Sequence, residues 1–313
     1  MATSYDITNL DSRLKNYLSA NKDELVSKAV FNSKSSRLLN LQTGVKNPTA
    51  IVRLDSSVTL ADGTTCGFNA TGEDVFTNRT LKPSFIKVNK QFCSKDFINS
   101  FKAYDVKISA TGQQDAMPFE QQIIESNLNQ LGAIVEKLIW QGDKTNGVGN
   151  MALADGLYTL IDADITNSVI PAGNVIAKGS DSIWTRVQKL WLALDPAMAA
   201  NANILMSVSM FKQMIIDLTN SNLYHIFEEV TEGEYKISMP GAAGTTIRGI
   251  EGLEGLDVII ATPMDNLYYG VDLENDSEEV DLFYSKDDRV FKMVIEFVVA
   301  TNYAIPEYIY VNR

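Results

Sequence analysis

The sequence predicts an α+β fold, and three observations predict it. Residues 118–141 carry apolar side chains three and four positions apart, which is the spacing of an amphipathic helix. Residues 46–93 are dense in Thr, Gly, Asn and Asp and contain short β-branched runs, a pattern typical of strands and turns. Residues 150–277 mix helix and strand patterns, and residues 278–313 read as strands.

Composition places the chain among globular proteins. Its 313 residues are 45% hydrophobic and 21% charged, enough for one large domain or two ordinary ones. The best apolar run, residues 290–300, contains Lys292 and Glu296, so the sequence predicts no transmembrane helix. The first residues lack the apolar segment of a secretory signal.

Charge argues against a protein that adheres to nucleic acid. Asp and Glu number 39 against 27 Lys and Arg, which gives a net charge of −12, and the sequence contains no basic cluster. The charge does not exclude a protein that lies close to DNA without adhering to it.

Residues 1–45 are expected to form a helical arm. Leu10, Leu14 and Leu18 recur every four residues, and Asn21 is placed to cap a second helix. Two such short helices cannot bury their apolar faces on each other. The arm is therefore expected to pack elsewhere, for example on a neighbouring chain.

Residues 46–93 predict an extended β-hairpin. Asp62-Gly63 is a hairpin-type turn, with strands expected at residues 58–60 and 64–68. Apolar residues alternate poorly around Ile51 and Arg53, so neither face is expected to be strongly buried. Because a lone two-stranded ribbon is marginally stable, we expect this hairpin to rest on a neighbouring subunit.

Residues 94–149 predict a short helix over 94–104, opened by Ser94, and then the long helix of residues 118–141. Pro118 suits a first helical turn, and Gly142 suits the end of a helix. At 1.5 Å per residue this helix would be on the order of 36 Å long, which indicates a structural spine.

Residues 150–313 predict helices and strands in turn. A helix is expected after a Ser or Asp cap at residues 180–182, a strand at 203–208, a helix capped by Ser209 and a strand at 256–261. Residues 286–289 are the expected turn between two terminal strands. The apolar face of the first helix is formed by Trp184, Val187, Leu190, Trp191 and Leu194.

Two glycine-rich stretches invite a phosphate-binding interpretation. GDKTNG, residues 142–147, carries the Lys144-Thr145 pair and the glycine interval of a P-loop, but Val148-Gly149 stands where Lys-Ser/Thr is required. It also follows a helix C-terminus, whose partial negative charge repels phosphate. Residues 241–249 lack the lysine, and no periodic helix follows them. Both stretches are interpreted as turns.

No other pattern supports catalysis or metal binding. The acidic residues 272–281 fail the EF-hand spacing, because Ser277 and Phe283 stand where Gly and Glu are needed. His225 is the only imidazole, and no GxSxG motif is present. Cys66 and Cys93 have no CxxC partner, which favours reduced thiols over a zinc site. The sequence therefore predicts no catalytic, cofactor-binding or metal site, and no enzyme.

The order of these parts resembles the tailed-phage major capsid protein of the Hong Kong ninety-seven type, a fold shared with encapsulins. Residues 41–69 and 85–97 look like the region around the extended loop in capsid proteins of crAss-like and related Bacteroidetes phages. Residues 118–147 and 155–161 look like the spine helix with its glycine-bearing turn and the strand entry after it. Residues 204–214 resemble the strand-to-helix step of the A domain.

The resemblance implies five parts. Residues 1–45 would be the N-terminal arm, 46–93 the extended loop, and 94–149 the P domain with its spine helix. Residues 150–277 would be the A domain, and 278–313 strands returning to the P domain. Some family members cross-link subunits through a Lys–Asn bond. Lys82, Lys87 and Lys90 lie in or near the loop, but no partner motif matches.

The resemblance implies a major capsid protein that forms hexamers and pentamers of an icosahedral shell around double-stranded DNA, without sequence-specific binding. Portal, scaffold or decoration proteins would be its other partners. It would reside in the virion after assembly in the host bacterial cytoplasm, with no membrane involved. We further hypothesise that the acidic charge makes an inner wall that repels DNA. An encapsulin-like compartment protein and, more distantly, a soluble α/β nucleotide-binding enzyme are the alternatives.

Overall fold

The computed structural model describes residues 33–60, 74–93, 119–222, 234–242, 244–272, 279–288 and 290–313. Several expectations lie outside these ranges: the helices predicted within residues 1–32 and 94–104, the Asp62-Gly63 turn, His225 and Cys66. None of the described helices is both long and apolar enough to cross a lipid bilayer.

The first sheet has five strands, and its centre is the long C-terminal strand β12 (Val290–Tyr303). Its order is β1-β10-β12-β11, and β4 also pairs with β12. The antiparallel ladder between β12 and β4 joins Val290 to Cys93 at one end and Val299 to Ser84 at the other. The other strands are β1 (Asn40–Gln42), β4 (Ser84–Cys93), β10 (Leu267–Gly270) and β11 (Glu279–Ser285).

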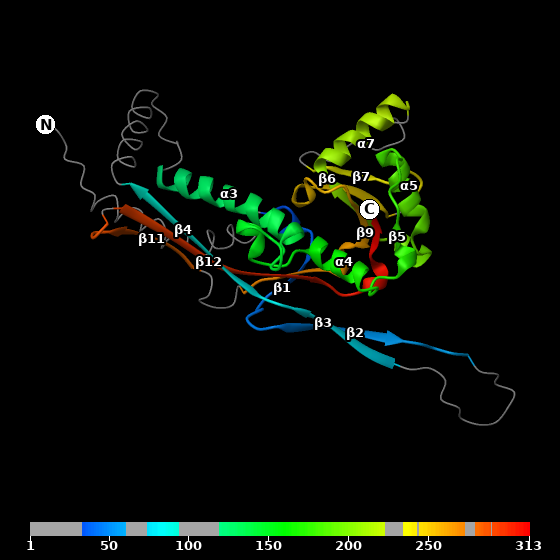
Figure 1. Ribbon diagram of the computed structural model, residues 1–313, viewed down its shortest axis with the longest axis horizontal. Helices are drawn as coiled ribbons and strands as arrows, with labels where there is room; N and C mark the ends of the chain where they lie inside the picture. The colour runs from blue at the N-terminus through cyan, green and yellow to red at the C-terminus, as the bar shows by residue number, and fades with distance from the viewer. Residues whose placement is uncertain are drawn as a thin grey trace.

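The predicted spine helix is confirmed as α3 (Phe119–Gln141), which runs alongside β4 and β12 in Figure 1. Its 23 residues span about 35 Å at 1.5 Å per residue. One face joins a core with side chains of β4 and β12, including Ile86, Ile295 and Phe297. The buried residues of that face are Ile124, Leu128, Leu131, Val135, Leu138 and Ile139.

The second sheet has six strands in the order β5-β13-β9-β6-β8-β7. Because side chains alternate across a strand, Ile204 and Leu205 of β6 face two different cores. One core contains residues of α3 and α4 (Leu157–Thr166), and the other contains residues of α5 (Ile183–Ala193) and α7 (Val208–Asn220). The strands are β5 (Val175–Ile176), β6 (Ala202–Ser207), β7 (Lys236–Ser238), β8 (Thr246–Ile250), β9 (Ile259–Pro263) and β13 (Tyr310–Asn312).

The extended hairpin consists of β2 (Thr49–Ser56) and β3 (Asp74–Leu81), paired antiparallel over their full lengths. In Figure 1 it projects away from the two sheets. The predicted hairpin is confirmed for these strands, but residues 84–93, which the prediction also included, form β4 of the five-stranded sheet. The strand expected at residues 58–60 is wrong, because β2 ends at Ser56 and residues 57–60 form no ladder.

Short helical turns complete the described chain. Their bounds are η1 (Ser35–Arg37), η2 (Gly149–Ala152), η3 (Ala172–Asn174), α6 (Pro196–Ala199), η5 (Glu251–Leu253), η6 (Met264–Asn266) and η7 (Pro306–Tyr308).

Four local expectations need correction or refinement. Residues 155–161, which were expected to enter a strand, instead lead into helix α4, which begins at Leu157. Ser207, and not Ser209, caps α7, because its hydroxyl accepts from the Met210 amide at 3.2 Å. Ser209 instead donates its hydroxyl to Glu254 at 2.8 Å. The strand expected at residues 256–261 begins three residues later, as β9. The cap of α5 is Ser182, as expected, and its hydroxyl accepts from the Thr185 amide.

The membership of strands in the two sheets does not follow the order of the sequence. β10 comes from residues 150–277 but pairs with β12 in the five-stranded sheet, whereas β13 comes from residues 278–313 but pairs with β9 in the six-stranded sheet. The C-terminal residues therefore do not all return to the spine helix and its sheet. Since any free strand edge offers the same backbone groups, sequence pattern alone does not select the edge.

Candidate functional site

The loop after α3 is filled by its own side chains. The Asp143 carboxylate accepts hydrogen bonds from the backbone N–H groups of Asn146 and Thr145, which lower the pKa of Asp143. The Lys144 N–H donates to the Asp155 carboxylate at 2.9 Å. Amide groups that would hold a phosphate are thus occupied by carboxylates. The turn expected at residues 142–147 is confirmed.

Gly142 ends α3 because the backbone packs closely there. A Cβ on Gly142 would lie 2.3 Å from the Ala154 carbonyl oxygen, and one on Gly156 would lie 2.5 Å from the Trp140 carbonyl carbon. The two loop segments are joined by a hydrogen bond of 2.7 Å from the Gly156 N–H to the Gly142 carbonyl oxygen. The glycines serve close approach, and Gly142 is not among the described residues with a positive φ.

Among the described residues, the other candidate stretches do not bring together side chains suited to catalysis or metal binding. Gly241 lies in a turn, Gly244 has φ +93°, and β8 begins at Thr246. Asp272 is fully buried, but most of the acidic stretch that follows it lies outside the described ranges. Cys93 is an exposed free thiol at the end of β4. Within the described ranges, no group of three His, Cys, Asp or Glu residues is placed to hold a metal ion.

The exposed apolar side chains of the extended hairpin form a surface of a different kind. Register pairs Leu54 with Phe76 and Val52 with Asn78, so Val52, Leu54 and Phe76 share one face of the ribbon. Their exposed fractions are 65%, 53% and 72%. We call these three residues the hairpin stripe. A face this apolar on a two-stranded ribbon is typical of a protein–protein contact.

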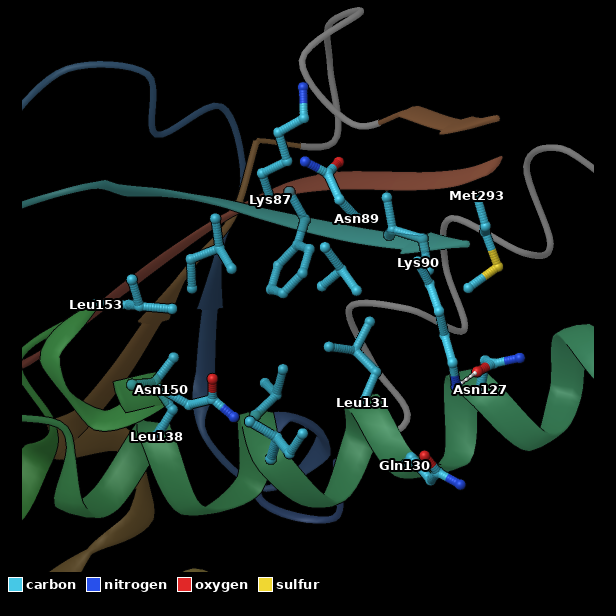
Figure 2. Close-up of a pocket in the computed structure, with 16 residues that line it drawn as sticks. Lys87, Asn89, Lys90, Asn127, Gln130, Leu131, Leu138, Asn150, Leu153 and Met293 are labelled. Carbon is cyan, nitrogen blue, oxygen red and sulfur yellow. Dashed lines mark hydrogen bonds between the residues drawn. The ribbon is translucent and has the colours of Figure 1, made fainter. Parts of the chain in front are cut away.

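A groove of about 310 Å³ lies between α3 and the strands β4 and β12. Figure 2 shows Leu131 and Leu138 of α3 on one side of it and Met293 on the other. Lysines lie on its β4 wall: Lys90 donates to the Asn127 side-chain oxygen at 2.5 Å, and Lys87 pairs with Glu296 at 2.6 Å. The third lysine named from the sequence, Lys82, lies in the turn between β3 and β4.

The base of the hairpin is attached to the body by a polar cluster. The Arg79 guanidinium pairs with Asp164 of α4 at 2.5 Å and stacks 4.0 Å above the Tyr303 ring. The Tyr303 hydroxyl donates to the same Asp164 carboxylate. Burial, and then the bond to Asp164, raise the pKa of Tyr303, so the hydroxyl remains a donor. This cluster fixes the direction in which the hairpin leaves the sheets.

A second buried cluster joins α3 to η1, near the start of the described residues. Glu136 is 3% exposed, and its carboxylate accepts from the Ser35 N–H at 2.8 Å and the Ser35 hydroxyl at 2.6 Å. The Gly252 N–H approaches it at 3.3 Å, and the Trp140 indole N–H donates to the Ser35 hydroxyl. Burial raises the pKa of Glu136. Sequence reasoning missed this residue, although a glutamate beside Val135 on an apolar helix face was the available signal.

Comparison with known proteins identifies the fold. No protein-family model matches the sequence, and no curated protein matches it. A chain of the satellite phage P4 procapsid matches with a TM-score of 0.62 at 11% identity, covering 98% of each chain. A chain of Microbacterium phage Oxtober96 matches with a TM-score of 0.55 at 12% identity, covering 90% of each chain.

The SrpI encapsulin of Synechococcus elongatus PCC 7942 also matches, with a TM-score of 0.55 at 8% identity. The match covers 88% of this chain and 85% of the encapsulin chain. At these identities the likeness establishes the fold alone. The predicted phage-capsid type of α+β fold, shared with encapsulins, is confirmed.

Proposed function

We propose that this chain is a major capsid protein that self-assembles into an icosahedral shell. The observation that carries the proposal is the match to the satellite phage P4 procapsid chain, which extends over 98% of both chains. The fold is therefore shared over nearly the whole length of this chain. The arrangement of the described side chains supports a structural role, because the glycine-rich turn is occupied by its own carboxylates.

The hairpin stripe supports assembly. Val52, Leu54 and Phe76 stand on a ribbon that projects from the sheets in Figure 1, and burying them on another copy removes apolar surface from water. A closed shell needs several different contacts per subunit, and projecting segments supply them. We propose that the ribbon of β2 and β3 reaches over a neighbouring subunit, as we also propose for the part of the N-terminal arm that precedes η1.

The finer assignments belong to the same proposal. Residues 94–149 would form the P domain, residues 150–277 most of the A domain, and hexamers and pentamers the shell around double-stranded DNA. Portal, scaffold or decoration proteins would complete a virion assembled in the bacterial cytoplasm. The stretches at residues 41–69 and 85–97 support a relation to capsid proteins of crAss-like and related Bacteroidetes phages.

An encapsulin-like compartment is the second candidate, and the likeness to the SrpI encapsulin favours it. The contents of the particle distinguish the two functions. A capsid purified from its natural source contains double-stranded DNA, whereas an encapsulin contains protein cargo. Nuclease-protected DNA inside the particle would support the capsid, and co-purified enzyme without DNA would support the compartment.

Electron microscopy of the purified recombinant chain tests the assembly step. We expect closed shells or rings of capsomers. A monodisperse monomer at all protein concentrations and ionic strengths would contradict the proposal. A nucleotide-binding assay tests the distant enzyme alternative, and we expect no binding of ATP or GTP to the loop at residues 142–147.

The acidic charge gives one more expectation. We hypothesise that the inner wall of the shell is acidic and lets DNA slide during filling. A reconstruction of the assembled particle would place the net charge of −12 on the inner or outer face. A strongly basic inner lining would contradict this hypothesis.

A further inference from the structure

A cavity of about 390 Å³ lies where the residues around η1 meet α3, β7 and β8. Its walls carry four cationic side chains from three parts of the chain, although the protein has a net charge of −12. We call them the basic cluster: Lys34, Arg37, Lys236 and Arg248.

Three carboxylates also line this cavity, and two of them, Glu136 and Glu251, accept hydrogen bonds. Glu136 accepts from the Ser35 N–H and hydroxyl, Glu251 pairs with Lys34 at 2.6 Å, and Glu234 lies 3.6 Å from Arg248. The last separation is too long for a hydrogen bond. Glu234 therefore does not satisfy the terminal guanidinium nitrogens of Arg248 by a hydrogen bond.

Lys236 and Arg248 face each other directly across the antiparallel pair of β7 and β8. Like charges at directly opposed positions destabilise a sheet. The Arg248 Nε donates to the Asn203 side-chain oxygen at 3.1 Å, which fixes its guanidinium on this face. Among the residues that the structure describes, Lys236 has no hydrogen-bond or ion-pair partner. An anion between the two side chains would remove their repulsion.

We propose that this cavity binds an oxyanion of the phosphate class, held between Lys236 and Arg248. Phosphate oxygens accept charge-assisted hydrogen bonds from ammonium and guanidinium groups, which matches these two side chains. The hydrogen bond to Glu251 raises the pKa of Lys34, so this third cation stays protonated at the cavity wall. The phosphate group comes either from the free ion or from the phosphodiester backbone of nucleic acid. The inference does not depend on shell assembly.

Titration calorimetry at fixed ionic strength tests the site, with inorganic phosphate in one arm and a short double-stranded DNA in the other. Lys236→Gln removes one charge-assisted contact, so we expect about tenfold weaker binding of whichever probe binds the wild-type protein. Lys286→Gln is the matched control, because Lys286 lies exposed in the turn between β11 and β12. This variant makes the same charge change and is expected to bind like the wild type.

Thermal unfolding gives a second readout that does not depend on calorimetric heat. Without phosphate, Lys236→Gln is expected to unfold at the same or a higher temperature than the wild type, since it relieves repulsion with Arg248. Phosphate is expected to raise the melting temperature of the wild type and of Lys286→Gln by more than that of Lys236→Gln at the same phosphate concentration. Binding in the phosphate arm assigns the free ion, and binding in the DNA arm alone assigns the phosphodiester. Absence of binding in both arms, or equal binding by Lys236→Gln and the wild type, overturns the proposal.

Discussion

Arg79 of the hairpin and Asp164 of α4 form an ion pair of 2.5 Å between the Nη2 and Oδ2 atoms, and both side chains are less than one fifth exposed. The pair joins residues 85 positions apart in the sequence. Asp164 also accepts from Tyr303, while the Arg79 Nε donates to Asn302 at 3.3 Å. A ribbon that projects from the body is thus held at its base by a desolvated polar cluster.

Arg79→Ala is expected to lower the free energy of unfolding by about 3 kcal/mol, because it leaves the Asp164 carboxylate partly buried without its cation. Urea unfolding measures the loss, and a double-mutant cycle with Asp164→Ala isolates the pair. Lys87→Ala is the control, since the Lys87–Glu296 pair is about half exposed and contributes at most about 1 kcal/mol. Equal losses for Arg79→Ala and Lys87→Ala would contradict the anchoring role.

Glu136 gives the unfolding free energy a pH dependence of known sign. Burial raises the pKa of Glu136 above its ordinary value of 4.5, so the folded protein holds this proton more tightly than the unfolded chain. The corresponding stabilisation is complete below pH 4.5 and is lost as the pH rises through the folded pKa. Glu136→Gln removes this titration but also loses hydrogen bonds accepted from Ser35.

Urea unfolding of both proteins between pH 4 and pH 8 checks the expectation. The stability of the wild type relative to Glu136→Gln is expected to fall as the pH rises, and to level off once Glu136 is ionised. A difference that is constant across this range would show that the burial of Glu136 does not affect its titration.

Gly142→Ala is expected to destabilise the protein by about 2 to 3 kcal/mol, because its Cβ would lie 2.3 Å from the Ala154 carbonyl oxygen and the backbone must shift. Gly173→Ala is the matched control, since a Cβ there meets nothing within 4 Å. Thermal unfolding of both variants measures the difference. A Gly142→Ala protein as stable as Gly173→Ala would show that the turn adapts without cost.

Phe76→Ser tests the hairpin stripe under the proposed function. The side chain is 72% exposed in the single chain, so the variant is expected to keep the free energy of unfolding within about 0.5 kcal/mol. Shell yield, measured by size exclusion and electron microscopy, is expected to fall sharply, because the assembled state loses buried apolar area.

Leu192→Ser is the control for this substitution, because Leu192 on α5 is 76% exposed and lies outside the stripe. It makes a similar loss of exposed apolar surface and is expected to assemble normally. Shells of normal yield from Phe76→Ser would exclude the stripe from the subunit contact.

Local sequence patterns determined several elements directly. The three- and four-residue spacing from Ile124 to Ile139 is sufficient to predict α3, because an amphipathic face must be buried. The apolar runs of β6 and β9 and the polar turn at residues 286–288 follow from equally local rules. The sequence also shows that residues 142–149 do not match the P-loop motif, since that motif requires particular residues at particular spacings.

Tertiary structure decided what local patterns leave open. Ser207 and Ser209 are equally good caps by type, and packing of β6 against α7 selected Ser207. β13 lies between β5 and β9 in the six-stranded sheet, and no local pattern in its sequence specifies these two neighbours. Glu136 with Ser35 and Arg79 with Asp164 are contacts across long stretches of chain. Spacing rules reach only a few residues, whereas these partners meet only after the chain has folded.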